Sequence, residues 1–215
     1  MNTLIVAGGE INLALLKEIY EARKPQIIIA VDKGLEALHT LHIMPNHIVG
    51  DFDSIDKTIL EYYQNNSGIV QHTYHPEKDN TDTDIALELA IRLSASHITM
   101  IGALGNRMDH SLANIHILVN ALEAQIPCEI IDTHNRIYLV NKSHIIKKEE
   151  AYGKYISLIP LTSSVEGLTL TGFQYPLTQA TLTFGKSLGV SNEIVGDTAC
   201  IVLENGILIV IESKD

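Results

Sequence analysis

The stretch HITMIGALGNRMDHSLANIHILVNALEAQIPCEIID (97–132) contains two short apolar runs separated by a segment with a helical pattern. The runs HITMIG (97–102) and CEIID (128–132) lack alternation with polar residues, which is typical of strands covered on both faces. The segment 110–124 between them is predicted to be a helix. A strand, a helix and a strand in this order predict a parallel pair joined by a right-handed crossover.

The same alternation extends back to the start of the chain. Three earlier runs of apolar residues have the same character and lie at 3–9, 26–32 and 47–51. Helical patterns between the runs predict further helices at 11–23, 34–41, 56–65 and 82–94. We therefore predict an α/β domain over residues 1–132, built on a Rossmann-like parallel sheet.

The pattern changes near residue 133, where helical signals become weak. The rest of the chain carries short strand-like runs separated by Gly, Asn, Thr and Ser, which predicts an all-β sandwich over 133–215. Glu204-Asn205-Gly206 lies between two such runs and predicts a hairpin turn. No linker rich in Pro or Gly separates the halves, so we expect two packed domains.

Composition excludes several classes of protein. With 215 residues, 46% of them hydrophobic, and a mean hydropathy of +0.13, the chain can bury a sizeable core. No apolar run approaches the roughly 20 residues of a membrane-spanning helix, so no membrane partner is expected. A net charge of −11 disfavours nucleic acid as a partner. The two cysteines lie in apolar runs, which fits a reducing cytoplasm without disulfides.

Acidic residues gather where ligands bind a parallel sheet, beyond the carboxyl ends of its strands. Asp51 and Asp53 lie in GDFDS (50–54), directly after a predicted buried strand, and side chains two apart in extended chain point the same way. The segment KDNTDTD (78–84) adds Asp79, Asp82 and Asp84. Clustered carboxylates without cysteine or histidine favour Mg²⁺. Singly, these last three residues could equally cap a helix or face solvent, and Asp56 is interpreted as a surface or capping residue.

The loop and helix GALGNRMDHSLANIHIL (102–118) form the third candidate region. Arg107 could bind a phosphate through two parallel hydrogen bonds. Asp109 could bind Arg107, cap the helix or join the active site, and Asn114 could reach a ligand or be polar surface. In GVSNE (189–193), Ser191 and Asn192 are interpreted, from the residues alone, as an ordinary turn.

Four stretches, taken together, resemble the bacterial thiamine pyrophosphokinase family. They occur in the family's order and span nearly the whole chain: PNHIVGDFDSID (45–56), HPEKDNTDTDIALELA (75–90), IGALGNRMDHSLANI (101–115) and GFQYPLTQATLTFGKSLGVSNE (172–193). The resemblance implies a kinase of the transferase class, which passes the pyrophosphoryl group of ATP to thiamine and yields thiamine diphosphate and AMP. It also implies a homodimer, with thiamine bound near the subunit interface against the sandwich domain.

The resemblance also assigns roles to residues. The implied ligands of Mg²⁺ are Asp51, Asp53 and Asp82, and the implied thiamine contacts are Ser191 and Asn192. The full catalytic set expected is Asp51, Asp53, Asp79, Asp82, Asp84, Arg107 and Asp109. The residues expected to bind ATP are Asp32, Lys33, Lys78, Asn80, Thr81, Arg107 and Asn114. Lys33 stands where the family often has glycine, so it could contact phosphate or face solvent.

Three questions stay open at this point. Either Asp84 or Asp109 could accept the proton of the attacking hydroxyl. Because the chain has no tryptophan, Tyr175 or Phe184 could contact the thiamine ring, although both could also be sandwich core. Transfer to another primary alcohol, such as a hydroxymethylpterin, is the enzymatic alternative, and a non-catalytic nucleotide or thiamine sensor is the alternative from another class.

Overall fold

The computed structural model describes residues 1–53, 55–65, 68–73 and 80–215. The chain divides into two compact units, Met1–Thr133 and His134–Asp215. Among the described residues, no helix combines the length and the apolar character needed to cross a lipid bilayer.

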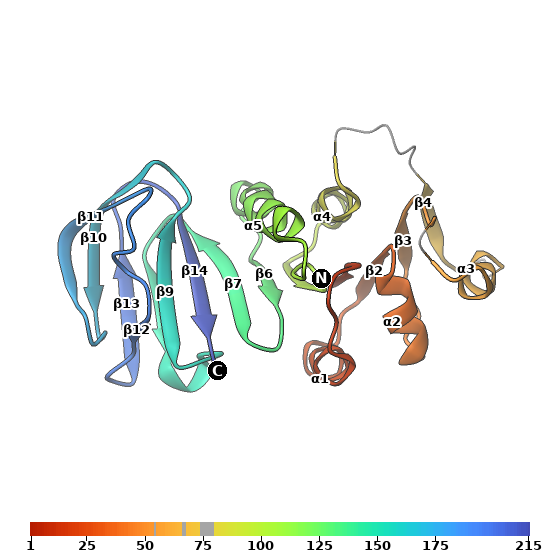
Figure 1. Ribbon diagram of the computed structural model, residues 1–215, viewed down its shortest axis with the longest axis horizontal. Coiled ribbons are helices and arrows are strands. Elements are labelled where there is room, and N and C mark those ends of the chain that lie inside the picture. The colour runs from red at the N-terminus through yellow and green to blue at the C-terminus, as the bar shows by residue number, and fades with distance from the viewer. Residues whose placement is uncertain (54, 66–67, 74–79) are drawn as a thin grey trace. The chain divides into compact units, whose positions relative to one another are not determined.

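The first unit contains a parallel sheet (Figure 1). Its strands are β1 (Asn2–Val6), β2 (Ile27–Val31), β3 (His47–Gly50), β4 (Val70–Thr73), β5 (His97–Ile101) and β6 (Cys128–Ile131). They lie side by side in the order β6-β5-β1-β2-β3-β4, and each neighbouring pair is parallel. The chain proceeds from β1 to β4 in one direction and from β5 to β6 in the other. The direction of winding therefore reverses between β1 and β5.

Helices cover both faces of this sheet. They are α1 (Leu13–Arg23), α2 (Gly34–Thr40), α3 (Lys57–Gln64), α4 (Asp82–Arg92) and α5 (Met108–Glu123). In Figure 1, α1 and α2 lie on one side of the strands, and α4 and α5 lie on the other. The predicted helices are confirmed, with boundaries within two residues of those expected. Three of them begin at residues whose side chains accept a backbone N–H of the first turn, namely Asn12, Asp56 and Thr81.

Burial explains which strands were predictable from sequence. In β1, β2 and β5 every residue after the first is buried, which matches continuous apolar runs covered on both faces. Strand β4, with the sequence VQHT, was not predicted. It occupies the edge of the sheet beside β3, and its first residue, Val70, is half exposed. An edge strand with polar residues carries no apolar run for a pattern to detect.

The second unit consists of two antiparallel sheets facing a common core. The strands are β7 (Asn135–Val140), β8 (His144–Lys147), β9 (Tyr155–Pro160), β10 (Ser164–Thr171), β11 (Leu177–Thr183), β12 (Asn192–Glu193), β13 (Thr198–Val202) and β14 (Leu208–Ser213), with a short 3-10 turn, η1 (Lys148–Glu150), after β8. Within this unit, the strands of one sheet lie in the order β12-β9-β14-β7, and the other sheet has the order β11-β10-β13-β8. Leu158 and Val210 from the first sheet pack in one cluster with Leu170 and Ile201 from the second. Short strands with one buried face thus produce a sandwich.

The predicted hairpin at Glu204-Asn205-Gly206 is wrong. Strand β13 pairs with β10 and β8, whereas β14 pairs with β7 and β9, so the turn carries the chain from one sheet to the other. Asn205 instead bridges to Glu166. Turn chemistry specifies a reversal of direction, but it does not specify which strands then pair.

Candidate active site at the carboxyl ends of the parallel strands

The loop after β1 is hydrogen-bonded to the loop after β5, at the point where the winding direction reverses between these two strands. Gly9 N donates to Gly102 O at 2.8 Å, and Glu10 N donates to Leu104 O at 3.0 Å. A Cβ on Gly9 would lie 2.4 Å from both of those carbonyl oxygens, so only glycine fits there. In doubly wound sheets this point of reversal is where ligands bind, beyond the carboxyl ends of the strands.

The ends of β2 and β3 bring Asp32 against Gly50. A Cβ on Gly50 would lie 2.1 Å from Asp32 Oδ1, and Gly50 has φ +147°. Asp32 and Phe52 themselves adopt left-handed backbone conformations, with φ values of 46° and 64°. Such conformations are costly for residues with a side chain and cluster at functional sites. These conformations make the two strand ends candidates for a binding site.

The aspartate pair follows β3 directly. Phe52 is buried, Asp51 is half-buried and Asp53 is exposed. Asp51 Oδ1 accepts a hydrogen bond from Asp53 N at 3.2 Å. In the part of the chain that the structure describes, no three His, Cys, Asp or Glu side chains form a group that could hold a metal. The donor set nonetheless fits Mg²⁺, because carboxylates beside open solvent leave room for the waters and phosphates that complete its shell.

Helix α4 carries the second acidic group. Thr81 caps the helix and accepts from Asp84 N at 3.3 Å, so capping falls to Thr81 and not to Asp82 or Asp84. Asn80 Nδ2 donates to Glu88 Oε1 at 3.4 Å. Lys78 and Asp79, predicted to belong to the site, lie outside the described residues.

The surroundings of Asp84 raise the pKa of its carboxyl. Burial, reinforced by the nearby charge of Glu88, raises the pKa of this carboxyl, while a hydrogen bond from Asn120 Nδ2 at 3.4 Å opposes that rise. Asp109 behaves in the opposite way, because the hydrogen-bonded Arg107 lowers its pKa to about 2. The two candidate bases of the sequence analysis are therefore distinguished by their surroundings.

Arg107 and Asp109 form an exposed bidentate pair. Arg107 Nη2 donates to Asp109 Oδ2 at 2.6 Å, and Nε donates to Oδ1 at 3.2 Å. Of the three roles considered for Asp109, the structure shows the contact with Arg107. The Arg107 side chain is 70% exposed, so a phosphate can approach it. Lys33, at the start of α2, is also exposed.

Asn114 is neither polar surface nor open to solvent. It is 5% exposed, and its Nδ2 donates to Ala103 O at 2.7 Å. Ser111, which the sequence analysis missed, is also buried, and its Oγ accepts from Gly105 N at 3.2 Å. The sequence spacing could have indicated this burial, because Ser111, Asn114 and the buried Leu118 share one face of the helix. Polar residues on an apolar face indicate a specific hydrogen-bonding partner.

In the second unit, Ser191 and Asn192 differ in role. Asn192 is 3% exposed, and its side chain accepts from Tyr175 N at 3.0 Å and donates to Tyr175 O at 2.8 Å. Ser191 is exposed with φ 59°, and its N donates to Ser157 Oγ at 3.0 Å. Tyr175 and Phe184 are exposed and so are not core. Asn192 also begins β12, where a plain turn was expected from the residues alone.

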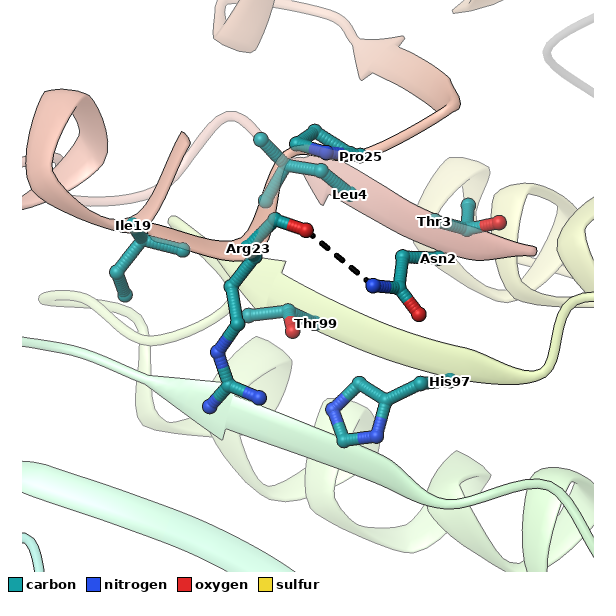
Figure 2. A pocket seen from close by; sticks show the side chains of 8 residues that line it. All are labelled: Asn2, Thr3, Leu4, Ile19, Arg23, Pro25, His97 and Thr99. Atoms are coloured by element: carbon teal, nitrogen blue, oxygen red, sulfur yellow. Dashed lines mark hydrogen bonds between the residues drawn. The ribbon is translucent and has the colours of Figure 1, made fainter. Parts of the chain in front are cut away.

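A pocket lies at the opposite, amino-terminal edge of the parallel sheet (Figure 2). It is lined by Asn2, Thr3, Leu4, Ile19, Arg23, Pro25, His97 and Thr99, and none of these is a predicted site residue. Arg23 and His97 both contact the buried Glu129 carboxylate, at 2.7 Å and 2.9 Å. Removing one partner of such a buried cluster is costly, so we interpret it as structural.

The fold and these loops define a class of protein: a parallel α/β unit with its candidate ligand-binding residues at the reversal of the sheet, followed by a β-sandwich. Two family models match the chain. They are "Thiamin pyrophosphokinase, catalytic domain" over residues 20–130 and "Thiamin pyrophosphokinase, vitamin B1 binding domain" over 143–208. The chain belongs to the thiamin pyrophosphokinase family.

Individual relatives agree. The chain is 36% identical to the thiamine pyrophosphokinase of Bacillus subtilis (strain 168), over 98% of each chain. A crystal structure of thiamine pyrophosphokinase from Bacillus subtilis superposes with a TM-score of 0.88 at 34% identity, covering 100% of both chains. The structure of thiamin pyrophosphokinase from Geobacillus thermodenitrificans gives a TM-score of 0.85 at 30% identity, covering 100% of this chain and 98% of that one.

Proposed function

We propose that this chain is a thiamine diphosphokinase, which transfers the pyrophosphoryl group of ATP to the hydroxyl of thiamine and forms thiamine diphosphate and AMP. The observation that carries the proposal is the 36% identity to a thiamine pyrophosphokinase over 98% of the chain, together with both family models. We assign ATP and catalysis to residues 1–132, whose sheet we class as Rossmann-like, and thiamine binding to residues 133–215.

The α/β unit supplies charge neutralisation and positioning, which phosphoryl transfer needs most. Asp51, Asp53 and Asp82 would hold Mg²⁺, which would neutralise phosphate charge when bound. Arg107 stabilises the charge that develops on the transferred group. Further contacts to the nucleotide come from strand and helix ends, at Asp32, Lys33, Asn80 and Thr81. The sequence adds Lys78 to the nucleotide contacts and Asp79 to the catalytic residues.

Asp84 is the better candidate to accept the proton of the thiamine hydroxyl. Its pKa is raised by burial, so its carboxylate is the more basic of the two. Asp109 is engaged by Arg107, which lowers its pKa to about 2 and makes it a weak base. We therefore assign Asp109 to holding Arg107 in place before phosphate arrives.

Ser191 and Asn192 form the thiamine subsite. Ser191 is exposed and offers its hydroxyl to the ligand, whereas Asn192 contributes by holding the backbone of Tyr175. Tyr175 is 61% exposed and can place its ring against the thiazolium or pyrimidine.

A homodimer in the cytoplasm completes the proposal. Large apolar side chains are exposed in one segment of the second unit, at Tyr175, Phe184, Leu188, Val190 and Val195. Exposed apolar surface of this kind marks interaction sites, and a second copy of the chain is the partner proposed here. The free thiols of Cys128 and Cys200 suit a reducing compartment.

Product analysis tests the function directly. The protein is mixed with ATP, Mg²⁺ and thiamine, and the products are separated by chromatography. Equal amounts of AMP and thiamine diphosphate are expected. ADP with thiamine monophosphate would overturn pyrophosphoryl transfer. Product only with a hydroxymethylpterin would overturn the acceptor, and tight binding without AMP release would indicate a sensor.

A further inference from the structure

The loop from Gly102 to Arg107 is held from two sides. Along one side, the β1 loop donates backbone hydrogen bonds from Ala7 N to Ile101 O at 2.8 Å, and from Gly9 and Glu10 as described above. Gly102 turns away from β5 with φ +71°. The backbone hydrogen bonds from the β1 loop therefore hold this loop as far as Leu104.

The remainder of the loop is held by helix α5. Asn114 Nδ2 donates to Ala103 O, and Ser111 Oγ accepts from Gly105 N. Ser111 Oγ also donates a hydrogen bond to Arg107 O at 3.2 Å. The same carbonyl oxygen accepts a second hydrogen bond, from Ser111 N, at 3.0 Å. Two side chains of one helix face thus contact the loop at three successive points, the last of which is Arg107 itself.

These two polar side chains occupy positions that packing alone would give to apolar residues. Ser111 is 6% exposed and Asn114 is 5% exposed. A buried hydroxyl or amide destabilises a protein unless it is hydrogen-bonded, and a buried loop N–H or C=O has the same requirement. Each group therefore satisfies the other, and these hydrogen bonds stabilise the observed conformation of the loop.

We propose that Ser111 and Asn114 are positioning residues, which hold the 102–107 loop so that Arg107 is presented to the phosphates of the nucleotide. The proposal rests on the proposed function and assigns Asn114 an indirect role in place of the nucleotide contact expected from sequence. A small displacement of a group that stabilises the transition state can cost about a hundredfold in rate, so holding this loop matters for turnover.

A double-mutant cycle tests whether Asn114 acts through Arg107. The ratio kcat/KM for ATP is measured for the wild-type protein, Asn114→Ala, Arg107→Ala and the double variant. We expect Asn114→Ala alone to lower kcat/KM by about tenfold or more, with the KM for thiamine unchanged. In the Arg107→Ala background the same change should cost less than about twofold, because the residue it positions is absent.

Equal losses in both backgrounds would overturn the proposal, because Asn114 would then act independently of Arg107. Leu118→Ala is the matched control, since Leu118 is buried on the same helix face. This variant should lower stability but leave kcat/KM for ATP unchanged below its unfolding temperature. A loss equal to that of Asn114→Ala would show that any weakening of α5 suffices.

Ser111 provides a second variant in case Asn114→Ala does not fold. Ser111→Ala should lower kcat/KM for ATP, and Ser111→Thr, which keeps the hydroxyl, should restore it. Amide hydrogen exchange at Gly105 should accelerate in Ser111→Ala but not in Leu118→Ala. Unchanged exchange would overturn the proposal. This measurement needs no substrate, so it remains informative even if the wild-type protein releases no AMP and the proposed function fails.

Discussion

At the scale of single residues, the aspartates near strand and helix ends differ in the groups that their carboxylate oxygens contact. Asp56, interpreted from the sequence as a surface or capping residue, accepts from Ile59 N at 3.3 Å and from Thr58 N at 2.8 Å and so caps α3. These two backbone hydrogen bonds lower its pKa. Asp53 contributes its backbone N–H to Asp51 and leaves its carboxylate exposed. The same residue type therefore caps a helix at Asp56, whereas at Asp53 we propose that it binds Mg²⁺.

Asp53→Asn should lower kcat by at least about a hundredfold, because it removes a charged ligand from the proposed Mg²⁺ site while keeping the side-chain shape. The unfolding temperature should hardly change, since Asp53 is exposed. Steady-state kinetics and thermal unfolding provide the measurements. Asp56→Asn is the control, because Asn is also a good helix cap and should preserve activity. Near-normal turnover in Asp53→Asn would remove the metal role.

The Asp109 carboxyl should titrate with a midpoint of about 2, below its ordinary value of 3.8, because the ionised form is hydrogen-bonded to Arg107. The contribution of the pair to stability is therefore complete above pH 3.8 and is lost as the pH falls towards 2. Carbon NMR of the carboxyl resonance measures this directly. Arg107→Gln should return the midpoint towards 3.8. An unchanged midpoint in that variant would show that Arg107 is not the cause.

Ser191→Ala should raise the KM for thiamine without changing the KM for ATP, because it removes the hydroxyl proposed to contact thiamine. The unfolding temperature should not change, because Ser191 is exposed. Asn192→Ala should also lower stability, by about 1–3 kcal/mol, since it strips two partners from the Tyr175 backbone. Substrate titrations and chemical unfolding separate the two variants. An effect of Ser191→Ala confined to ATP would contradict its assignment.

At the scale of elements, the close packing between α2 and β1 requires glycine at position 34, where a side chain would not fit. A Cβ on Gly34 would lie 2.0 Å from Val6 O and 2.6 Å from Val6 C. Gly34→Ala should therefore destabilise the protein by about 1–3 kcal/mol or more, measured by urea unfolding. Gly196→Ala is the control, because its nearest neighbour would lie 3.9 Å away. Equal midpoints for the two variants would contradict the packing argument.

Helices and strands were predictable from sequence where a local residue pattern was enough to specify them. Buried strands such as β1 and β2 appear as continuous apolar runs, and Thr81 and Asp56 cap their helices locally. Strand β4 and strand β12 were missed, because an edge strand and a two-residue strand contain no diagnostic period. Their existence depends on neighbours distant in the sequence, β3 and β9.

At the scale of the whole molecule, the proposed homodimer gives a direct test. The wild-type protein should sediment with about twice the 23.7 kDa mass of the chain. Phe184→Glu should shift it to the monomer, because Phe184 is 74% exposed and a charge there disfavours burial against a second copy. Analytical ultracentrifugation measures both masses.

Ile145→Glu is the matched control for the dimer, because Ile145 is 63% exposed in the same unit but lies outside the 175–195 segment. This variant should remain dimeric. If Phe184→Glu remains dimeric, the interface does not include Phe184 and must lie on another surface. A monomeric wild-type protein would refute the homodimer.

The sequence by itself determined the alternation of buried strands and helices, the change to β structure near residue 133, and the residue types at the strand ends. These features follow from local periodicity, which nearby residues carry. Only the tertiary structure decided that β13 and β14 belong to different sheets, that Asn114 contacts Ala103, and that Asn192 contacts Tyr175. Those choices depend on which distant backbone groups need a partner, and a one-dimensional pattern does not encode that need.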